Sequence, residues 1–115
     1  MNVMTTTSAL TAAKHELALR RRRNEVLGQE LFGEPAWDML LDLFVAHEED
    51  RPLSVGRLCS AAGVPESTAR RWLATLESHG TVVRTSDPAD ACSELVLLTA
   101  AERDRLVRFL GEGGG

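Results

Sequence analysis

The segment from Ser54 to Arg84 constrains the fold more than any other part of the chain. It has the pattern of two short helices joined by a tight turn. Ser54 is a good N-cap for the first helix, and Gly63 can end it in the left-handed conformation that glycine adopts without strain. Pro65 cannot continue that helix but suits the start of the next. The pattern predicts a helix-turn-helix whose second helix ends at Gly80.

The predicted second helix, about residues 66–78, has two unlike faces. Its apolar face, which should pack in the core, carries Ala69, Trp72, Leu73 and Leu76. Stacking of Trp72 on a base is the alternative, but the helical spacing favours core packing. Hydroxyl, small and basic side chains make up the opposite face: Ser67, Thr68, Arg70, Arg71, Ala74 and Thr75. Hydroxyls and guanidiniums are the groups that contact phosphates and base edges in a major groove. This helix is therefore the candidate DNA-binding element.

Two helices are predicted before this segment. The first spans about residues 8–27 and has a loose apolar stripe, while the polar residues 1–7 should be disordered. Residues 31–33 lead into the second, about residues 35–46, with Pro35 at the favoured first position. The core face of that second helix consists of Trp37, Leu40, Leu41, Phe44 and Val45.

A β-hairpin and a last helix are predicted after it. Residues 81–85 and 94–98 have the composition of strands, and residues 86–93 would form the tip between them. Thr99 and Glu102 have the spacing of a capping box. The helix that they open has an apolar side made of Leu106, Val107, Phe109 and Leu110.

The chain has 115 residues, 43% of them hydrophobic, which suffices for one modest core. The predicted fold is mainly α with a small β-hairpin wing, a winged helix-turn-helix domain. Residues 1–30 would be an N-terminal tail and helix available for dimerisation, residues 31–110 the winged domain, and residues 111–115 a flexible tail.

Charge is unevenly distributed around a formal net charge of -4. The run Arg20–Arg23 covers more than one helical turn, so at least one arginine must face away from any packing surface. Two interpretations remain open for the run: a solvated segment or ion pairs with Glu16 and Glu25, and a patch that contacts phosphate or a second subunit. A local basic patch can exist on an acidic protein, so net charge does not exclude nucleic acid.

Other chemistries find little support in the sequence. Cys59 and Cys92 indicate no disulfide framework, and the three histidines share no metal-ligand spacing. No residues pair a nucleophile with a base, and no glycine motif would cradle a phosphate, so neither an enzyme nor a bound cofactor is expected. Without an apolar run long enough to span a membrane or a signal peptide, a cytoplasmic protein is expected.

The order of these elements resembles a winged helix of the MarR (multiple-antibiotic-resistance regulator) type over about residues 37–110. The matching residues are Leu53, Ser54, Leu58, Cys59, Ser67, Thr68, Arg71, Leu76, Gly80, Val83, Arg84, Val96, Leu98 and Thr99. The resemblance implies that Ser67, Thr68, Arg70 and Arg71 enter the major groove. It also implies that Arg84 lies near a phosphate at the base of the wing.

The chain departs from that family in two places. MarR-type wings usually carry an Asp-x-Arg-Arg motif, where this chain has Asp90, Ala91, Cys92 and Ser93, so both basic positions are lost. We expect the residues after Leu110 to form no counterpart of the long C-terminal helices that build the family's dimer interface. We therefore expect the helix of residues 8–27 to provide most of a dimer contact.

Two functions remain as hypotheses. The first is a sequence-specific transcriptional regulator that binds double-stranded DNA as a homodimer on a pseudo-palindromic site. The second is a winged helix that contacts a partner protein through its acidic wing, where Asp87, Asp90 and Glu94 lie. The recognition helix favours the first function, and the wing and the net charge favour the second.

Overall fold

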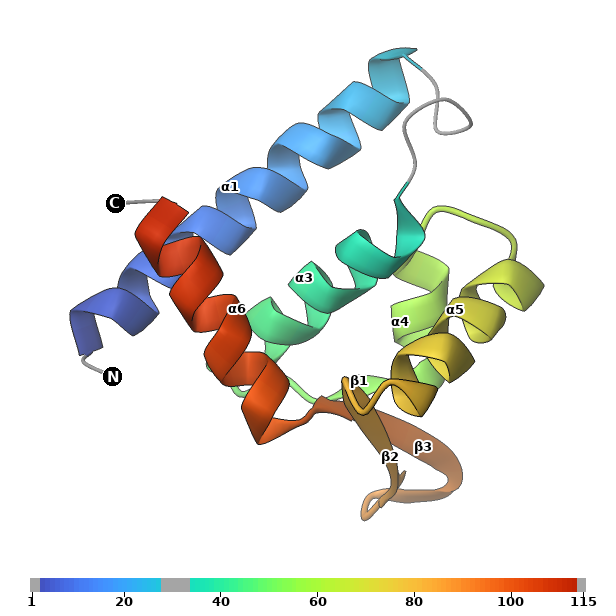
Figure 1. The fold of residues 1–115 in the computed structure, drawn as a ribbon. Helices are drawn as coiled ribbons and strands as arrows, with labels where there is room; N and C mark the ends of the chain where they lie inside the picture. The colour runs from blue at the N-terminus through green and yellow to red at the C-terminus, as the bar shows by residue number, and fades with distance from the viewer. Residues whose placement is uncertain (1–2, 28–33, 114–115) are drawn as a thin grey trace.

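The computed structural model describes residues 3–27 and 34–113. The described elements are α1 (Val3–Leu27), α3 (Pro35–Glu48), β1 (Leu53–Ser54), α4 (Val55–Ala61), α5 (Glu66–Ser78), β2 (Val82–Asp87), β3 (Asp90–Leu98) and α6 (Ala100–Gly113) (Figure 1). This is the predicted winged helix-turn-helix, mainly helical with a small antiparallel sheet. The predicted lead-in at residues 31–33 and the domain boundary near residue 30 lie outside the described residues.

The helix-turn-helix forms as its local signals predict. The Ser54 hydroxyl accepts a hydrogen bond from the backbone N–H of Arg57, 3.1 Å away, which caps α4. Gly63 and Gly80 have φ angles of 74° and 73°, the left-handed conformation in which glycine carries no Cβ penalty. Both glycines therefore end a helix, as predicted.

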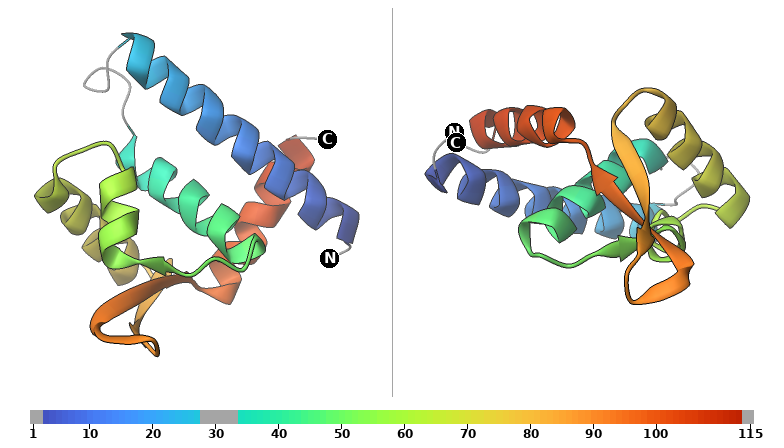
Figure 2. Two further views of the ribbon diagram at one scale, coloured as in Figure 1. Left: turned by 180° about the vertical axis from the view of Figure 1, so that it is seen from behind. Right: turned by 90° about the horizontal axis from the view of Figure 1, so that it is seen from below.

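One core joins all the described helices. Met39, Leu41 and Phe44 of α3 are fully buried at its centre, and Ala9, Ala13 and Leu17 supply the inner face of α1. α1 packs on both α3 and α6 (Figure 2). The N-terminal helix is therefore part of the same packed unit as the winged domain.

The sheet contains a strand that the sequence did not predict. β1 has two residues, Leu53 and Ser54, which pair antiparallel with Val96 and Leu95 of β3. The strand order is β1-β3-β2, so the returning strand of the wing lies in the middle. Thr99 ties the turn between α5 and β2 to α6, because its hydroxyl donates to the Gly80 carbonyl at 2.9 Å and accepts from the backbone N–H of Glu102 at 3.4 Å.

Both terminal helices are longer than predicted. α1 begins at Val3, so the expected disorder of residues 1–7 is wrong over the described part of that stretch. Ala9, in the second turn of α1, is fully buried in the core, so packing supports this end of the helix. α6 continues to Gly113 instead of ending near Leu110, which removes most of the expected flexible tail.

Candidate nucleic-acid interface

The outward face of α5 carries the predicted contact residues. Ser67, Arg70, Arg71 and Thr75 are exposed, and Thr68 is half-buried. On the inner face, Ala69, Leu73 and Leu76 are buried in the core. The structure thus brings five of the six predicted DNA-binding residues together on one helix.

Arg71 is the basic group on α5 with the fewest constraints. Each residue of an α-helix advances by about 100°, so Arg71 lies nearly opposite the stripe of Ala69 and Leu76. Within the described residues, its guanidinium makes no hydrogen bond or ion pair. A free guanidinium on an exposed helix face can reach a base edge or a phosphate without breaking an internal contact.

Two other polar groups of this face, on Arg70 and Thr75, already have partners within α5. The Arg70 guanidinium forms an ion pair with Glu66 one turn earlier, with Nη2 2.9 Å from Oε1. Both side chains are exposed, and such pairs stabilise a protein by less than about 1 kcal/mol, so a phosphate could replace the carboxylate. The Thr75 hydroxyl donates to the Arg71 carbonyl at 3.1 Å, which leaves its oxygen free only to accept.

Arg84, the sixth predicted residue, lies apart from this face on β2. Its side chain is 24% exposed and lies between two carboxylates, with Nε 3.3 Å from Glu77 and Nη1 3.9 Å from Glu94. Its charge is therefore largely compensated within the chain. A role as a phosphate contact would require these carboxylates to give way.

Trp72 is not in the core, and the prediction that it packs there is wrong. It is 39% exposed, whereas Leu73 beside it is fully buried. The reason is geometric: Trp72 lies at the border of the apolar stripe that Ala69, Leu73 and Leu76 form. The helical period alone does not show whether a residue at this border is buried or exposed.

The turn at the tip of the wing is shorter than the predicted tip of residues 86–93. β2 and β3 pair regularly as far as Ser86 with Glu94, and after an irregularity Asp87 pairs with Asp90, so only residues 88 and 89 form the turn. The Asp87 carboxylate accepts from the N–H of Ala89 at 2.9 Å, and the Asp90 carboxylate accepts from the N–H of Cys92 at 3.0 Å. These two acids shape the tip, which gives them a role within the chain.

Arg57 on α4, which was not among the predicted contacts, lines a surface hollow together with Glu66 at the start of α5. It is exposed, and its guanidinium has no partner in the part of the chain that the structure describes. Small side chains surround it on the outer face of α4: Gly56, Ser60 and Ala61. A small-residue surface around a free arginine lets another molecule's backbone approach closely. The signal was present in the sequence, since Arg57 lies in the first turn of the first helix of the helix-turn-helix.

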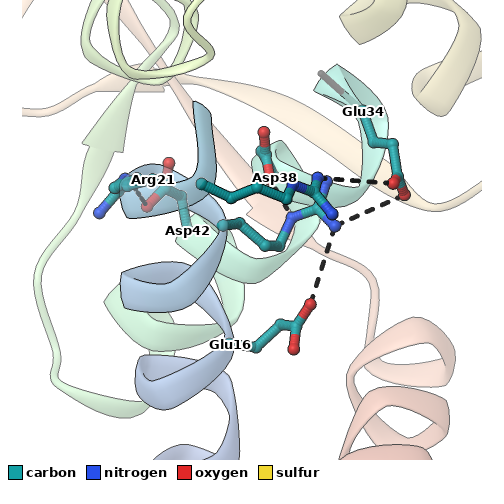
Figure 3. A network of polar contacts seen from close by, with 7 residues as sticks. Glu16, Arg21, Glu34, Asp38 and Asp42 are labelled. Atoms are coloured by element: carbon teal, nitrogen blue, oxygen red, sulfur yellow. Dashed lines mark hydrogen bonds and ion pairs between the residues drawn. The ribbon is translucent and has the colours of Figure 1, made fainter. Parts of the chain in front are cut away.

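The arginine run at the end of α1 is mostly used inside the molecule (Figure 3). Arg20 is 5% exposed, and its Nε lies 2.5 Å from the Asp38 carboxylate of α3, with Glu34 at 3.5 Å and Glu16 at 3.7 Å. Arg21 pairs with Asp42 of α3 at 2.7 Å. The interpretation as ion pairs is therefore confirmed for Glu16, but the shorter contacts are to α3 carboxylates that the sequence did not identify.

These contacts shift the ionisation of two groups. Burial opposes the charge of Arg20, but the hydrogen bond and the charge of Asp38 outweigh it and raise the arginine pKa. Burial also raises the pKa of Asp42 above its ordinary range, against the opposing effect of Arg21. The network therefore joins α1 to α3 and contributes little free positive charge to a partner.

Other sites have no support among the described residues. No group of three or more histidine, cysteine, aspartate or glutamate residues within 3–27 and 34–113 is arranged to hold a metal ion. In the same ranges, no helix has both the length and the apolar character needed to cross a membrane. Cys59 is buried and Cys92 is exposed, and both are free thiols.

Comparison with known proteins gives the fold a family context. The sequence of residues 39–86, from within α3 to β2, matches the family model of the IclR helix-turn-helix domain. No curated protein matches the chain. A mutant of MepR from S. aureus superposes with a TM-score of 0.58 at 22% identity, over 86% of this chain and 69% of the other. The transcriptional regulator Tm0710 from Thermotoga maritima gives 0.52 at 24%, over 87% and 69%.

At least two of the similar structures, a MepR mutant bound to an oligodeoxyribonucleotide and Sco3205, contain DNA. Sco3205, a MarR family transcriptional regulator from Streptomyces coelicolor in complex with DNA, gives a TM-score of 0.56 at 24% identity, over 92% of this chain and 61% of the other. The chain thus spans about two thirds of the length of these regulators. It has the winged helix-turn-helix fold of MarR-type regulators, as its sequence resemblance predicted.

Proposed function

We propose that this chain is a transcriptional regulator that binds double-stranded DNA sequence-specifically, with α5 in the major groove. The observation that carries the proposal is the outward face of α5, where the free Arg71 guanidinium lies opposite the buried stripe. Fold similarity to Sco3205, which was solved with DNA, supports the same function. An α-helix fits the major groove of B-DNA, and an arginine there can bond a guanine edge with two donors.

The proposed contacts divide by chemistry. Arg71 would read a base, and the Thr75 oxygen, which can only accept, would face a base amino group. Ser67, Thr68 and Arg70 would contact the groove and its phosphates. Arg57 on α4 adds a phosphate contact, because the first helix of a helix-turn-helix crosses the DNA backbone. Arg84 would join them only if a phosphate displaced its carboxylate partners.

A binding selection from random double-stranded DNA, followed by titration at several salt concentrations, tests the proposal. We expect an enriched sequence that binds about 10³-fold or more tightly than random DNA. The logarithm of the binding constant should fall linearly with the logarithm of the salt concentration. Equal affinity for enriched and random DNA would contradict sequence-specific binding, and no affinity for either would overturn the proposed function.

We further propose a homodimer on a pseudo-palindromic site, held by the outer face of α1. The inner face of α1 is already used within the chain. On its outer face, Leu19 and Val26 are seven residues apart and so lie along one line. Leu19 is 52% exposed and Val26 is 72% exposed. Large apolar side chains that line up along one helix face and remain exposed are typical of a surface that binds another protein. Ala18 is exposed on another side of α1, so a substitution there is a control for substitutions of Leu19 and Val26 that should break the dimer.

The alternative function, a protein contact through the acidic wing, has less to support it than the sequence indicated. Asp87 and Asp90 hold the tip together, and Glu94 pairs with Arg84. The acidity of the wing is thus partly explained by contacts within the chain. DNA binding through α5 remains the better-supported proposal.

A further inference from the structure

The two flanks of α5 differ in charge. One flank carries Glu66, Arg70 and Glu77, and it faces the wing, because Glu77 contacts Arg84 of β2. The other flank carries Thr68, Trp72 and Thr75 and has no charged group. In Figure 1 the wing strands lie next to the C-terminal end of α5. A nucleic acid that receives α5 would therefore meet a charged side and a neutral side.

Trp72 is the large group on the neutral flank. It is 39% exposed, and its indole N–H makes no hydrogen bond to any described residue. Trp37, the other tryptophan of the chain, instead packs edge-to-face on Phe109, with ring centroids 5.9 Å apart and planes at 79°. An exposed indole offers an apolar ring together with a donor at its edge, the combination suited to a surface that is partly apolar and partly polar.

The position of Trp72 determines which part of DNA it can reach. It lies about 100° around the helix from Arg71, so it points to the side of the groove when Arg71 points to the floor. A helix with its side chains is about 10–12 Å wide, and the major groove is about 12 Å wide. A large side chain on the flank of such a helix meets the groove wall, which consists of deoxyribose and phosphate, and not the base edges.

We propose that Trp72 is a neutral anchor on the DNA backbone, whose indole N–H donates to a phosphate oxygen while its ring packs on a deoxyribose. The inference rests on the proposed DNA binding by α5. It separates two kinds of phosphate contact on the same helix. A cationic contact releases counterions from DNA, whereas a neutral donor adds affinity without changing the salt dependence.

The substitution Trp72→Phe tests the proposal, because phenylalanine keeps an aromatic ring at the border of the core but lacks the donor. A hydrogen bond to a charged group is strong enough that we expect about tenfold weaker binding. The loss should be equal on the selected sequence and on random DNA, with an unchanged salt slope. Trp37→Phe is the matched control and should bind as the wild type does. Arg70→Ala should instead flatten the slope.

Fluorescence gives a second measurement that does not depend on the stability of a Trp72 variant. In the Trp37→Phe protein, Trp72 is the single tryptophan, and its emission should change on binding both selected and random DNA. Wild-type affinity of Trp72→Phe, or an emission unchanged by DNA, would overturn the anchor while leaving DNA binding intact. A changed preference at one base pair would also overturn it, in favour of base readout. If the wild type binds no DNA, the proposed function and the anchor both fail.

Discussion

Replacement of Asp38 by asparagine should destabilise the protein strongly. The change removes the negative charge nearest to Arg20, whose side chain is 6% exposed, while keeping the size of the side chain and one oxygen acceptor. Arg20 would then remain in the interface between α1 and α3 as a charge without its main partner. Breaking a buried ion pair from one side costs about 3–5 kcal/mol.

The surroundings of Arg20 place the expected value at the low end of that range. Glu34 and Glu16 still lie 3.5 and 3.7 Å from Nη1 and can compensate part of the charge. We therefore expect a loss of about 3 kcal/mol in the free energy of unfolding, measured by urea denaturation. For a chain of this size, the melting temperature should fall by roughly 10 °C or more.

Two controls make the result specific. Glu34→Gln alters a carboxylate whose side chain is 58% exposed, and should cost less than about 1 kcal/mol. The double variant Arg20→Met with Asp38→Leu removes both charges, and should recover most of the loss because the desolvation cost disappears with them. A stability of Asp38→Asn within about 0.5 kcal/mol of the wild type would refute the reasoning. So would a double variant less stable than the single one.

Three further predictions concern the dimer, the pH dependence of stability and the wing. Leu19→Glu with Val26→Glu should give a monomer by light scattering, and an unchanged mass would exclude the outer face of α1 as the interface. The raised pKa of Asp42 means that the folded state holds this proton more tightly than the unfolded state, so its contribution to stability is full below the ordinary value of 3.8 and declines as the pH rises through the raised value. Asp42→Asn should therefore gain stability relative to the wild type as the pH rises from acid toward neutral, and a constant difference in unfolding free energy would contradict the shift. Cys92→Arg with Ser93→Arg should tighten binding at low salt and steepen the salt slope by about 1 for each new phosphate contact, whereas an unchanged slope would place the wing away from DNA and favour a protein partner.

The features predicted correctly from the sequence are those that short-range chemistry determines. Ser54 caps α4, and Gly63 and Gly80 end their helices, because each signal acts over three or four residues. The buried stripe of α5 follows from its helical period. Trp72 was misassigned because a period places a residue on a side of a helix but does not give the depth of its burial at the border.

The features that were missed depend on contacts between distant residues. Arg20 and Asp38 are 18 positions apart, and only the packing of α1 on α3 brings them together. The strand β1 has two residues and exists only because β3 returns beside it. The partners of Arg84 likewise come from α5 and β3. A run of arginines in the sequence therefore overstates the basic surface of the folded protein. Most of the arginines at the end of α1 form ion pairs with carboxylates of α3 or with Glu34 just before it.

The central claim is that the outward face of α5 reads DNA, and Arg71→Ala tests it most directly. Arg108→Ala on α6 is the matched control, because Arg108 is also an exposed arginine without a partner among the described residues. In titrations of the selected DNA, Arg71→Ala should weaken binding by about 1–3 kcal/mol and relax the preference at one base position, with no change in melting temperature. Arg108→Ala should bind as the wild type does. Unchanged affinity and unchanged base preference in Arg71→Ala would contradict the claim.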